Sequence, residues 1–415
     1  MSKLQPARGT RDIYGEEARR MAAVVDAFKG VAGSHGFEEF STPIFEFTEV
    51  FKRPLGEASD IVMKEMYTFH DRGNEEVTLR PEFTAGICRA FISNGMQQNL
   101  PCRLMSWGPT FRYERPQKGR YRQFHQINAE TLGPDTPQTD VDMIALGWRL
   151  LSKLGINDKV TVHLNSLGDK ESREAYRSAL VEFLSGHKDA LSEDSQRRLL
   201  TNPLRILDSK DEGDRTIIKD APVLGDYFTE AASAFFAQVK AGLEALSIPY
   251  ELNSKLVRGL DYYNHTVFEF ITTKLGAQGT VLAGGRYDGL IKQLGGPPTP
   301  GVGFAGGIER LAMLIDEAPA VPRPTILMPM GDAAMLQAYT IAEDLRDAGV
   351  AVITERTGNL KKRLTRGAKV SAAFVIVIGD DELEKGAAMV KNMDTGDQTE
   401  APLTGLANVL SANKG

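Results

Sequence analysis

The chain has 415 residues, of which 42% are hydrophobic and 25% charged, and its formal net charge is −6. These proportions are those of a soluble globular protein of two or three domains, and no apolar run is long enough to span a membrane. Because the net charge is negative, any nucleic acid must be bound by a local basic patch and not by the field of the whole molecule.

Cellular location and metal content can also be predicted from the composition. The first residues, MSKLQPARGTRD, lack the apolar core of a secretory signal, which predicts a cytoplasmic protein. Cys88 and Cys102 are too few for a four-thiolate zinc site or a disulfide framework, so we expect them to be reduced. The six histidines show no ligand spacing, and no metal site formed by the protein is predicted.

The first eighty residues predict a helix, an interrupted strand and a hairpin. Apolar residues at helical spacing predict a helix from about Glu16 to Ala32. Residues 37–47 have the composition of a strand interrupted at Pro43, and this pair of elements fits either a subunit interface or a plain core helix with its strand. Residues 66–80 predict a hairpin that turns at 72–74.

The segment TLRPEFTAG, residues 78–86, leads into a helix that begins at Ala85. Thr84 could be the N-cap of this helix, with its hydroxyl satisfying an unpaired backbone amide. Glu82 needs another explanation. A carboxylate two residues before the cap, beside Arg80, is suited to binding an ammonium group.

The segment FRYERPQKGRYRQFHQ, residues 111–126, is rich in arginine and in aromatic residues. Its central PQKG predicts a turn between two strands. Strand periodicity places on one face Arg120, Arg122, Phe124, Gln126, Asn128 and Glu130. This face is either a solvated surface or a polyphosphate site. In the second case arginines would bind phosphate oxygens, a phenyl ring would stack on a base and an acid would bind a second substrate.

The middle of the chain predicts a helix at 138–154, a strand at 160–164 and then a mainly helical stretch at 169–247. Because this stretch lies between two strand-rich regions, we interpret it as a helical insertion. Strands resume in KLVRGLDYYNHTVFEF, residues 255–270. Arg258 precedes a glycine there, at which the backbone could approach a ligand closely.

A glycine-rich region, residues 283–307, contains GGRYDGL and GVGFAGGIERL. Three of its glycines match the G-x-G-x-x-G fingerprint of dinucleotide-binding folds. We reject that interpretation, because no strand directly precedes the glycines and no acid ends a following strand. A short strand at 302–305 and a helix are predicted instead, with Arg310 in the first turn of the helix and off its apolar stripe.

Residues 316–324, DEAPAVPRP, have the composition of a stiff linker. Strands and helices then alternate: we predict strands at 325–330, 351–354 and 373–378, helices at 332–348 and 359–371, and finally a hairpin and a last helix. The second helix carries Lys361, Lys362, Arg363, Arg366 and Lys369. Such a face is usually only solvated, but in an acidic protein it is a candidate contact for a phosphate backbone.

Five segments together resemble the histidyl-tRNA synthetases, a family of class II aminoacyl-tRNA synthetases. They are TLRPEFTAG, FRYERPQKGRYRQFHQ, LVRGLDYYN, GGRYDGL and GFAGGIER, in this order over essentially the whole chain. LVRGLDYYN is the histidine-specific one. The resemblance implies an α+β fold with an antiparallel catalytic sheet flanked by helices in residues 1–322, the helical insertion at about 169–247, and an α/β anticodon-binding domain in residues 323–415.

The resemblance also implies an activity and its partners. ATP, with Mg²⁺ on its phosphates, would convert L-histidine to histidyl-adenylate, and the histidyl group would then be transferred to the 3′-terminal ribose of tRNA(His). The family forms homodimers, which implies a second copy as a partner. No nucleophilic side chain is needed, because this chemistry is catalysed by positioning and charge stabilisation.

Roles are carried over position by position, with Arg258 and Arg112 as the catalytic residues. The histidine-binding residues would be Glu82 and Thr84 at the amino group, Gln126 at the polar end of the substrate, Glu130 and Tyr263 at the imidazole, Arg258 by the carboxylate and the α-phosphate, and also Tyr262. The ATP-binding residues would be Arg112, Glu114, Arg120, Phe124 under the adenine, and Arg310. The tRNA-binding residues would be Arg115 and Gln117 at the acceptor end, and Lys361, Lys362 and Arg363 in the C-terminal domain.

One departure and two alternatives remain. Phe83 stands where the family usually has glycine, which leaves the shape of the pocket wall open. A non-catalytic regulatory subunit of ATP phosphoribosyltransferase would share the catalytic fold, but such chains typically lose the arginines kept here and lack the C-terminal domain. A related synthetase for proline, threonine or glycine would not have the sequence RGLDYY that this chain has at residues 258–263.

Overall fold

The computed structural model describes residues 3–56, 61–201, 203–256, 262–276 and 279–412. The chain forms two compact units, Met1–Pro319 and Ala320–Gly415, and the division falls inside the proline-containing segment 316–324. Each unit has hydrophobic core clusters of its own, so each is described separately.

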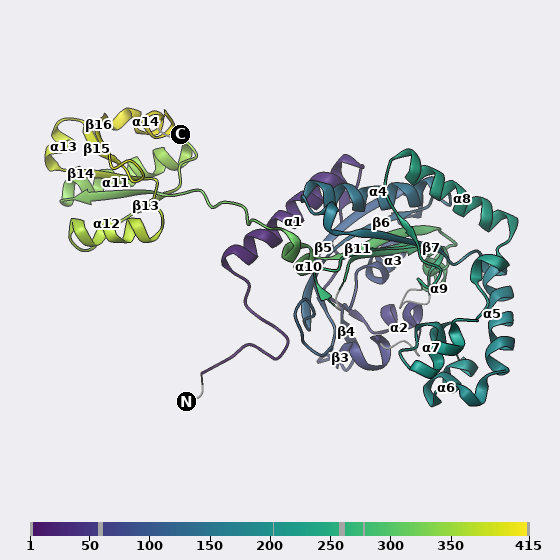
Figure 1. Cartoon of the computed structure of the whole chain (residues 1–415). Helices are drawn as coiled ribbons and strands as arrows, with labels where there is room; N and C mark the ends of the chain where they lie inside the picture. The colour runs from purple at the N-terminus through teal and green to yellow at the C-terminus, as the bar shows by residue number, and fades with distance from the viewer. Residues whose placement is uncertain (1–2, 57–60, 202, 257–261, 277–278, 413–415) are drawn as a thin grey trace. The chain divides into compact units, whose positions relative to one another are not determined.

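The first unit is built on a large sheet, which has eight strands over the described residues, in the order β1-β5-β6-β11-β10-β9-β7-β8 (Figure 1). The strands are β1 (Glu38–Glu39), β5 (Cys102–Phe111), β6 (Gln123–Leu132), β7 (Thr161–Ser166), β8 (Glu251–Leu252), β9 (Asn264–Ile271), β10 (Thr280–Arg286) and β11 (Gly301–Gly307). Neighbours run antiparallel except in the pairs β1–β5 and β7–β8. The predicted antiparallel sheet is confirmed, and so is the rejection of a dinucleotide fold, because β11 pairs antiparallel with both β6 and β10.

Long helices cover one face of this sheet. They are α1 (Gly15–Ser34), α4 (Pro137–Lys153), α8 (Glu230–Ala245) and the shorter α10 (Ile308–Leu314). Their apolar stripes share one core cluster with inward-facing strand residues such as Ile127 and Phe268. The sequence prediction placed α8 in the helical insertion, but its Val239 and Leu243 lie in this core. Figure 1 shows α4 and α8 on the same side of the sheet.

The opposite face carries short helices and a small antiparallel sheet in the order β2-β4-β3. These elements are α2 (Glu49–Leu55), α3 (Thr84–Ser93), α9 (Leu290–Gln293), β2 (Phe45–Phe47), β3 (Tyr67–His70) and β4 (Glu76–Leu79). The strand predicted at 37–47 is divided into β1 and β2, which belong to different sheets on either side of Pro43. Proline cannot donate to a strand ladder, which explains the break.

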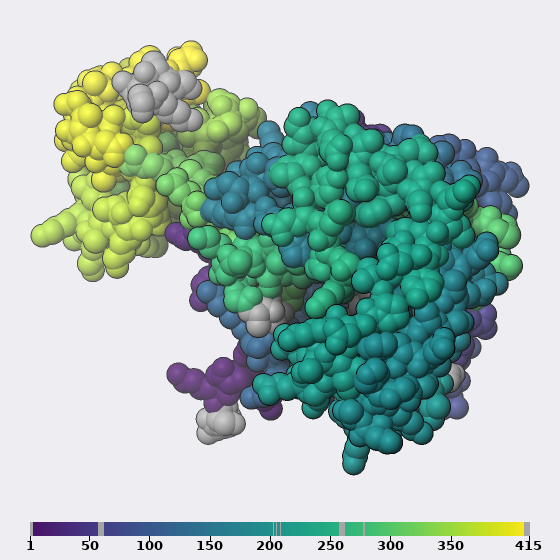
Figure 2. All heavy atoms as spheres, turned by 45° about the vertical axis from the view of Figure 1, so that its right-hand side comes forward, coloured from purple at the N-terminus to yellow at the C-terminus, as the bar shows by residue number. Residues whose placement is uncertain are grey.

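The helical insertion has a core of its own. Its helices are α5 (Lys170–Ser185), α6 (Glu193–Thr201) and α7 (Glu212–Ile218), and their buried residues include Tyr176, Leu180 and Leu199. Figure 2 shows the residues of this insertion, in teal, spread over a broad outer surface.

The second unit is an α/β domain, as predicted. Its sheet has the order β13-β12-β14-β15-β16, with the first three strands parallel and the last two added antiparallel. The strands are β12 (Thr325–Met330), β13 (Val352–Thr354), β14 (Phe374–Gly379), β15 (Ala387–Asn392) and β16 (Gln398–Pro402), and the helices are α11 (Asp332–Asp347), α12 (Leu360–Lys369), α13 (Asp380–Glu384) and α14 (Leu406–Ala412). Among all described helices of the chain, none is long and apolar enough to cross a membrane.

Candidate active site

A cavity of about 280 Å³ lies on the face of the large sheet that carries α3. Its lining comes from β6, β9, β10, β11, the β5–β6 connection and the starts of α3 and α10. Phe124 and Gln126 line it from alternate positions of β6, as strand periodicity predicts. The predicted turn is also present, because Gln117 and Arg120 exchange two backbone hydrogen bonds of 3.0 and 2.9 Å.

One part of the cavity is cationic and contains an aromatic ring. Arg112, Arg120 and Arg310 all line it. The guanidinium carbon of Arg112 lies 5.3 Å from the centre of the Phe124 ring. Arg112 Nε donates to the carbonyl oxygen of Pro81 at 2.9 Å, which fixes the direction of the side chain. This part can therefore bind an anionic group beside a flat ring system.

Arg310 is held where the hairpin turn meets β10. Its Nε donates to the carbonyl of Gly119 at 3.0 Å, and its Nη1 donates to that of Thr280 at 2.7 Å. Burial, together with repulsion from Arg112 and Arg120, lowers the pKa of Arg310 from its ordinary value. Three guanidinium groups that lie close together repel one another, although Glu114 pairs with Arg120. A polyphosphate bound among them would relieve their repulsion.

The carboxylates around this cationic part are already paired within the protein. Glu114 forms an ion pair with Arg120, and Glu309 accepts from the backbone amide and the ring Nδ1 of His125 at 3.0 and 2.9 Å. In the described part of the chain, no group of three or more metal-ligating side chains could hold an ion.

The other part of the cavity is lined by carboxyl, hydroxyl and amide groups. Glu82 is buried, and its carboxylate accepts from the backbone amides of Thr84 and Ala85 at 2.5 and 2.9 Å. This carboxylate caps α3, so the alternative in which the Thr84 hydroxyl is the cap is wrong. Burial raises the pKa of Glu82, and the two amide bonds partly oppose that change.

Glu130 lies directly behind this wall. Its carboxylate accepts hydrogen bonds from the Thr84 hydroxyl at 2.5 Å, from Asn128 Nδ2 at 3.0 Å and from the Tyr287 hydroxyl. Gly303 makes the space, because a Cβ there would lie 1.6 Å from a Glu130 oxygen. Burial raises the pKa of Glu130 to about 7, although its three hydrogen bonds favour the charged form. Glu130 itself is fully buried and does not line the cavity. Its hydrogen-bond partners Thr84 and Tyr287 do line the cavity.

Three tyrosines form the adjoining wall. Tyr262 and Tyr263 have ring centres 4.7 Å apart, and Tyr287 lies 5.8 and 6.5 Å from them. The GGRYDGL segment carries part of the family resemblance, but the sequence predicts no role for Tyr287. Only the position of the tyrosine within that segment could have indicated one. Its partner Glu130 is distant in the chain and becomes a neighbour through the strand order.

Gln126 adds an acceptor to the same wall. Its Oε1 is buried and, within the described residues, no group donates to it. A buried amide oxygen without a donor is unfavourable unless a ligand supplies one. An N–H group of a bound substrate would satisfy it.

The chain matches two family models over most of its length. One, described as histidyl-tRNA synthetase, covers residues 9–311, and the other, described as anticodon binding domain, covers residues 325–413. The chain belongs to the histidyl-tRNA synthetase family.

Individual members of the family are similar over the full length. The histidine--tRNA ligase of Gluconobacter oxydans (strain 621H) is 53% identical over 414 residues, which are 100% of both chains. That of Rhodospirillum rubrum is 54% identical over 412 residues, 99% of each chain. The crystal structure of apo histidyl-tRNA synthetase from S. aureus superposes with a TM-score of 0.84 at 34% identity, covering 98% of this chain and 100% of that one.

Two of the predicted tRNA-binding residues lie outside the lining of the cavity, and one predicted catalytic residue, Arg258, falls outside the residues that the structure describes. Arg115 and Gln117 are exposed at the hairpin turn. Phe83, the predicted departure from the family pattern, is 1% exposed and packs in the core under the Arg80 guanidinium, 4.1 Å from its ring centre. The Phe83 side chain is therefore not part of the lining of the cavity.

The basic helix α12 is only partly available to a ligand. Lys361 and Lys362 are exposed. Arg363 is 7% exposed and donates to the carbonyl groups of Pro329, Arg356 and Gly358 at 2.6, 3.0 and 2.9 Å. Its guanidinium stabilises the fold of the domain, so the structure does not support its assignment as a tRNA contact.

Proposed function

We propose that this chain is a histidine--tRNA ligase, which makes histidyl-adenylate from L-histidine and ATP and transfers the histidyl group to the 3′-terminal ribose of tRNA(His). One observation carries the proposal: a single cavity joins a cluster of arginines beside a phenyl ring to a wall of carboxyl, hydroxyl and amide groups. Two relatives that are named histidine--tRNA ligase match the chain over its full length at 53% and 54% identity, which supports histidine as the amino-acid substrate.

In the first step, a carboxylate oxygen of histidine attacks the α-phosphorus of ATP, and pyrophosphate leaves. Phe124 would stack on the adenine, and Arg112 and Arg310 would bind the phosphates; a Mg²⁺ ion bound to those phosphates would neutralise part of their charge. Because the transition state gathers negative charge on phosphate oxygens, fixed guanidinium donors stabilise it more than the ground state. The protein supplies position and charge, and substrate atoms form and break all the bonds.

At the other end of the cavity, histidine presents an ammonium group and an imidazole. The Glu82 carboxylate and the Thr84 hydroxyl would bind the ammonium. The unsatisfied Gln126 oxygen and the hydroxyls of Tyr263 and Tyr287 would face the ring nitrogens. A neutral imidazole has one donor and one acceptor, which such groups can distinguish.

In the second step, a ribose hydroxyl of tRNA attacks the carbonyl carbon of the adenylate, and AMP leaves. Arg115 and Gln117, exposed at the hairpin turn, would contact the acceptor end. Lys361 and Lys362 on α12 would contact the anticodon region, where they add a local positive charge to an acidic chain.

Exchange of labelled pyrophosphate into ATP, measured with each standard amino acid separately, tests this function. Histidine alone should support exchange. Exchange with another amino acid would assign a different synthetase, and no exchange with any would favour the non-catalytic regulatory subunit of ATP phosphoribosyltransferase.

The KM for histidine is expected to fall as the pH rises from about 6 to about 8, through the pKa of an essential acceptor. Burial raises the pKa of Glu130 to about 7, so this carboxyl is protonated at the lower pH and ionised at the higher. When ionised, it accepts from the Thr84 and Tyr287 hydroxyls, whose lone pairs then face the N–H groups of the substrate. When protonated, it needs an acceptor itself and turns one of these hydroxyls around.

The measurement is the KM for histidine across this pH range at saturating ATP. Glu130→Gln is the matched control, because it keeps the shape and cannot ionise. Any pH dependence that remains in it belongs to the substrate or to another group of the site, such as Glu82. Identical profiles for the two proteins would show that Glu130 has no such role.

A homodimer is the assembly that we propose, and the small β2–β4–β3 sheet offers a surface for it. Phe47, Val77 and Phe69 are cross-strand neighbours, so they share a face, and Phe45 lies two residues along β2. The three phenylalanines are 47–57% exposed. Monomeric proteins rarely leave such contiguous aromatic surface in water. A second copy of the chain would cover it.

Replacing both Phe45 and Phe47 by aspartate should therefore convert a dimer to a monomer, because charged side chains would have to be buried at the interface. Light scattering after size-exclusion chromatography gives the mass directly. The matched control is Leu336→Asp, at a 74% exposed position of the second unit. A wild-type monomer, or a variant that stays dimeric, would contradict this assignment.

A further inference from the structure

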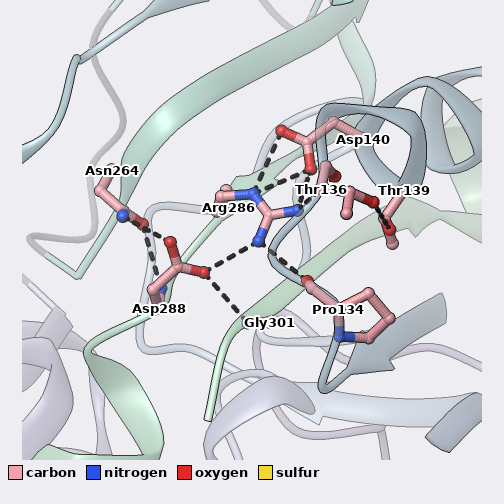
Figure 3. Close-up of polar contacts among 8 residues, drawn as sticks. All are labelled: Pro134, Thr136, Thr139, Asp140, Asn264, Arg286, Asp288 and Gly301. Atoms are coloured by element: carbon pink, nitrogen blue, oxygen red, sulfur yellow. Dashed lines mark hydrogen bonds and ion pairs between the residues drawn. The ribbon is translucent and has the colours of Figure 1, made fainter. Parts of the chain in front are cut away.

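Arg286, the last residue of β10, has a fully buried side chain outside the cavity lining. Its Nε and Nη2 donate to Asp140 of α4 at 2.9 and 2.5 Å, and its Nη1 donates to Asp288 at 3.0 Å (Figure 3). It also donates to the carbonyl groups of Pro134 and Thr136, both at 3.1 Å. One guanidinium therefore joins the end of β10 to the start of α4.

Asp288 extends this network to two further strands. Its Oδ1 accepts from the amide of Gly301, the first residue of β11, at 3.3 Å, and its Oδ2 accepts from the side chain of Asn264, the first residue of β9, at 2.9 Å. The Asp288 amide donates back to Asn264 Oδ1 at 3.0 Å. A single carboxylate thus links the ends of β9, β10 and β11, as Figure 3 shows.

Tyr287 lies between the two charged members of the network. Its amide donates to the carbonyl of Gly301 at 2.7 Å, and its hydroxyl donates to Glu130. Its ring packs directly on β11, because a Cβ at Gly301 would lie only 2.3 Å from it. With Arg286 and Asp288 fixed on either side, the ring has one position relative to the cavity.

Tyr263 is held at the other end of the network. It directly precedes Asn264, whose amide group is bound to Asp288 through two hydrogen bonds. The rings of Tyr263 and Tyr287 lie 6.5 Å apart at 73° and both line the cavity. The network therefore reaches both tyrosines through backbone immediately next to them.

We propose that Arg286, together with Asp288 and Asn264, forms a positioning network for the substrate amino acid that sets the distance and angle between Tyr263 and Tyr287. The inference rests on the proposed histidine-activating function. Its effect is specific to the amino-acid end of the cavity, because Arg286 ends β10, whereas the contact of β10 with Arg310 is made by Thr280 at the opposite end of the strand.

An arginine is needed at this place for a geometric reason. Its five N–H groups lie in one plane and here are divided between two carboxylates and two carbonyls. A lysine at 286 would keep the charge beside Asp140 but has one nitrogen, which cannot reach all four acceptors. Arg286→Lys therefore loosens the network without leaving a buried carboxylate unpaired. Asn264→Ala opens the link to Asp288 and removes no charge at all.

The test compares wild-type protein with Arg286→Lys and Asn264→Ala. We expect the KM for histidine in pyrophosphate exchange to rise about tenfold in both variants, which is the lower end of the loss seen when residues that orient metal ligands are replaced. The KM for ATP should stay unchanged. Titration calorimetry with histidine alone should show the same weakening. If Arg286→Lys does not fold, the KM of Asn264→Ala for histidine still tests the inference.

Arg363→Lys is the matched control. It changes another buried arginine that is bonded to carbonyl groups, in the second unit, and should lower the melting temperature with both KM values unchanged. An Arg286→Lys variant that behaves in this way, losing stability or kcat with an unchanged KM and affinity for histidine, would overturn the inference. Absence of exchange in the wild-type protein would instead contradict the proposed function, and calorimetry would still test the network.

Discussion

Histidine-dependent pyrophosphate exchange is expected to slow by about a hundredfold to a thousandfold when Arg112 is replaced by alanine. The guanidinium lines the cavity, and Pro81 and the Phe124 ring fix its direction. As the α-phosphorus gains a fifth oxygen, negative charge grows on the oxygens around it. A donor that is already oriented stabilises this charge without reorganising at the moment of reaction.

The matched control is Arg103→Ala, which removes an exposed arginine from β5 of the same hairpin and should leave exchange intact. Arg112→Lys should recover part of the rate, because it keeps the charge and loses the planar pair of donors. Transfer from preformed adenylate should suffer much less than exchange. A folded Arg112→Ala protein with wild-type exchange would remove Arg112 from the catalytic residues.

A chain that ends at Pro319 is expected to make adenylate at the rate of the full-length protein. It should charge tRNA about a hundredfold less efficiently, because the avidity gained from two linked binding modules is lost when one of them is removed. The structural reason is the division into two units with separate core clusters, so the cavity of the first does not need the second for its fold. The long tRNA would lose one of its two attachment sites.

Both reactions should be measured on the same truncated protein, so that exchange serves as the internal control for folding. Loss of exchange together with charging would mean that the second unit supports the fold of the first. Charging at full efficiency by the truncated chain would show that residues 320–415 do not take part in tRNA recognition.

Local patterns predicted the elements that depend on local forces. The β12 strand occupies its predicted residues, and Phe124 and Gln126 share a cavity-facing side, because β6 pairs with β5 without an irregularity over its whole length. The PQKG turn follows from the backbone preferences of proline and glycine. In these cases the neighbours along the chain determine the conformation.

Other features depend on partners that periodicity cannot identify. The apolar stripe of α8 predicts a buried face, but not that Val239 packs against the large sheet instead of the insertion. The bond between Glu130 and Tyr287 requires the strand order β6-β11-β10. A buried arginine such as Arg363 has the same sequence signature as an exposed one, since three backbone carbonyls can satisfy it without any acidic neighbour.

Gly303 restricts how this wall could change during evolution. It pairs with Glu130 across β6 and β11, and a Cβ at 303 would lie 1.6 Å from a Glu130 oxygen and 2.6 Å from the backbone carbonyl oxygen of Ala129. A shorter residue at 130 would remove the first clash and leave the second, because the backbone oxygen stays where it is. Mutational routes to a new amino-acid specificity through this wall are therefore open at Glu130 and closed at Gly303, and a change at Glu130 gives up the acceptor for Thr84 and Tyr287.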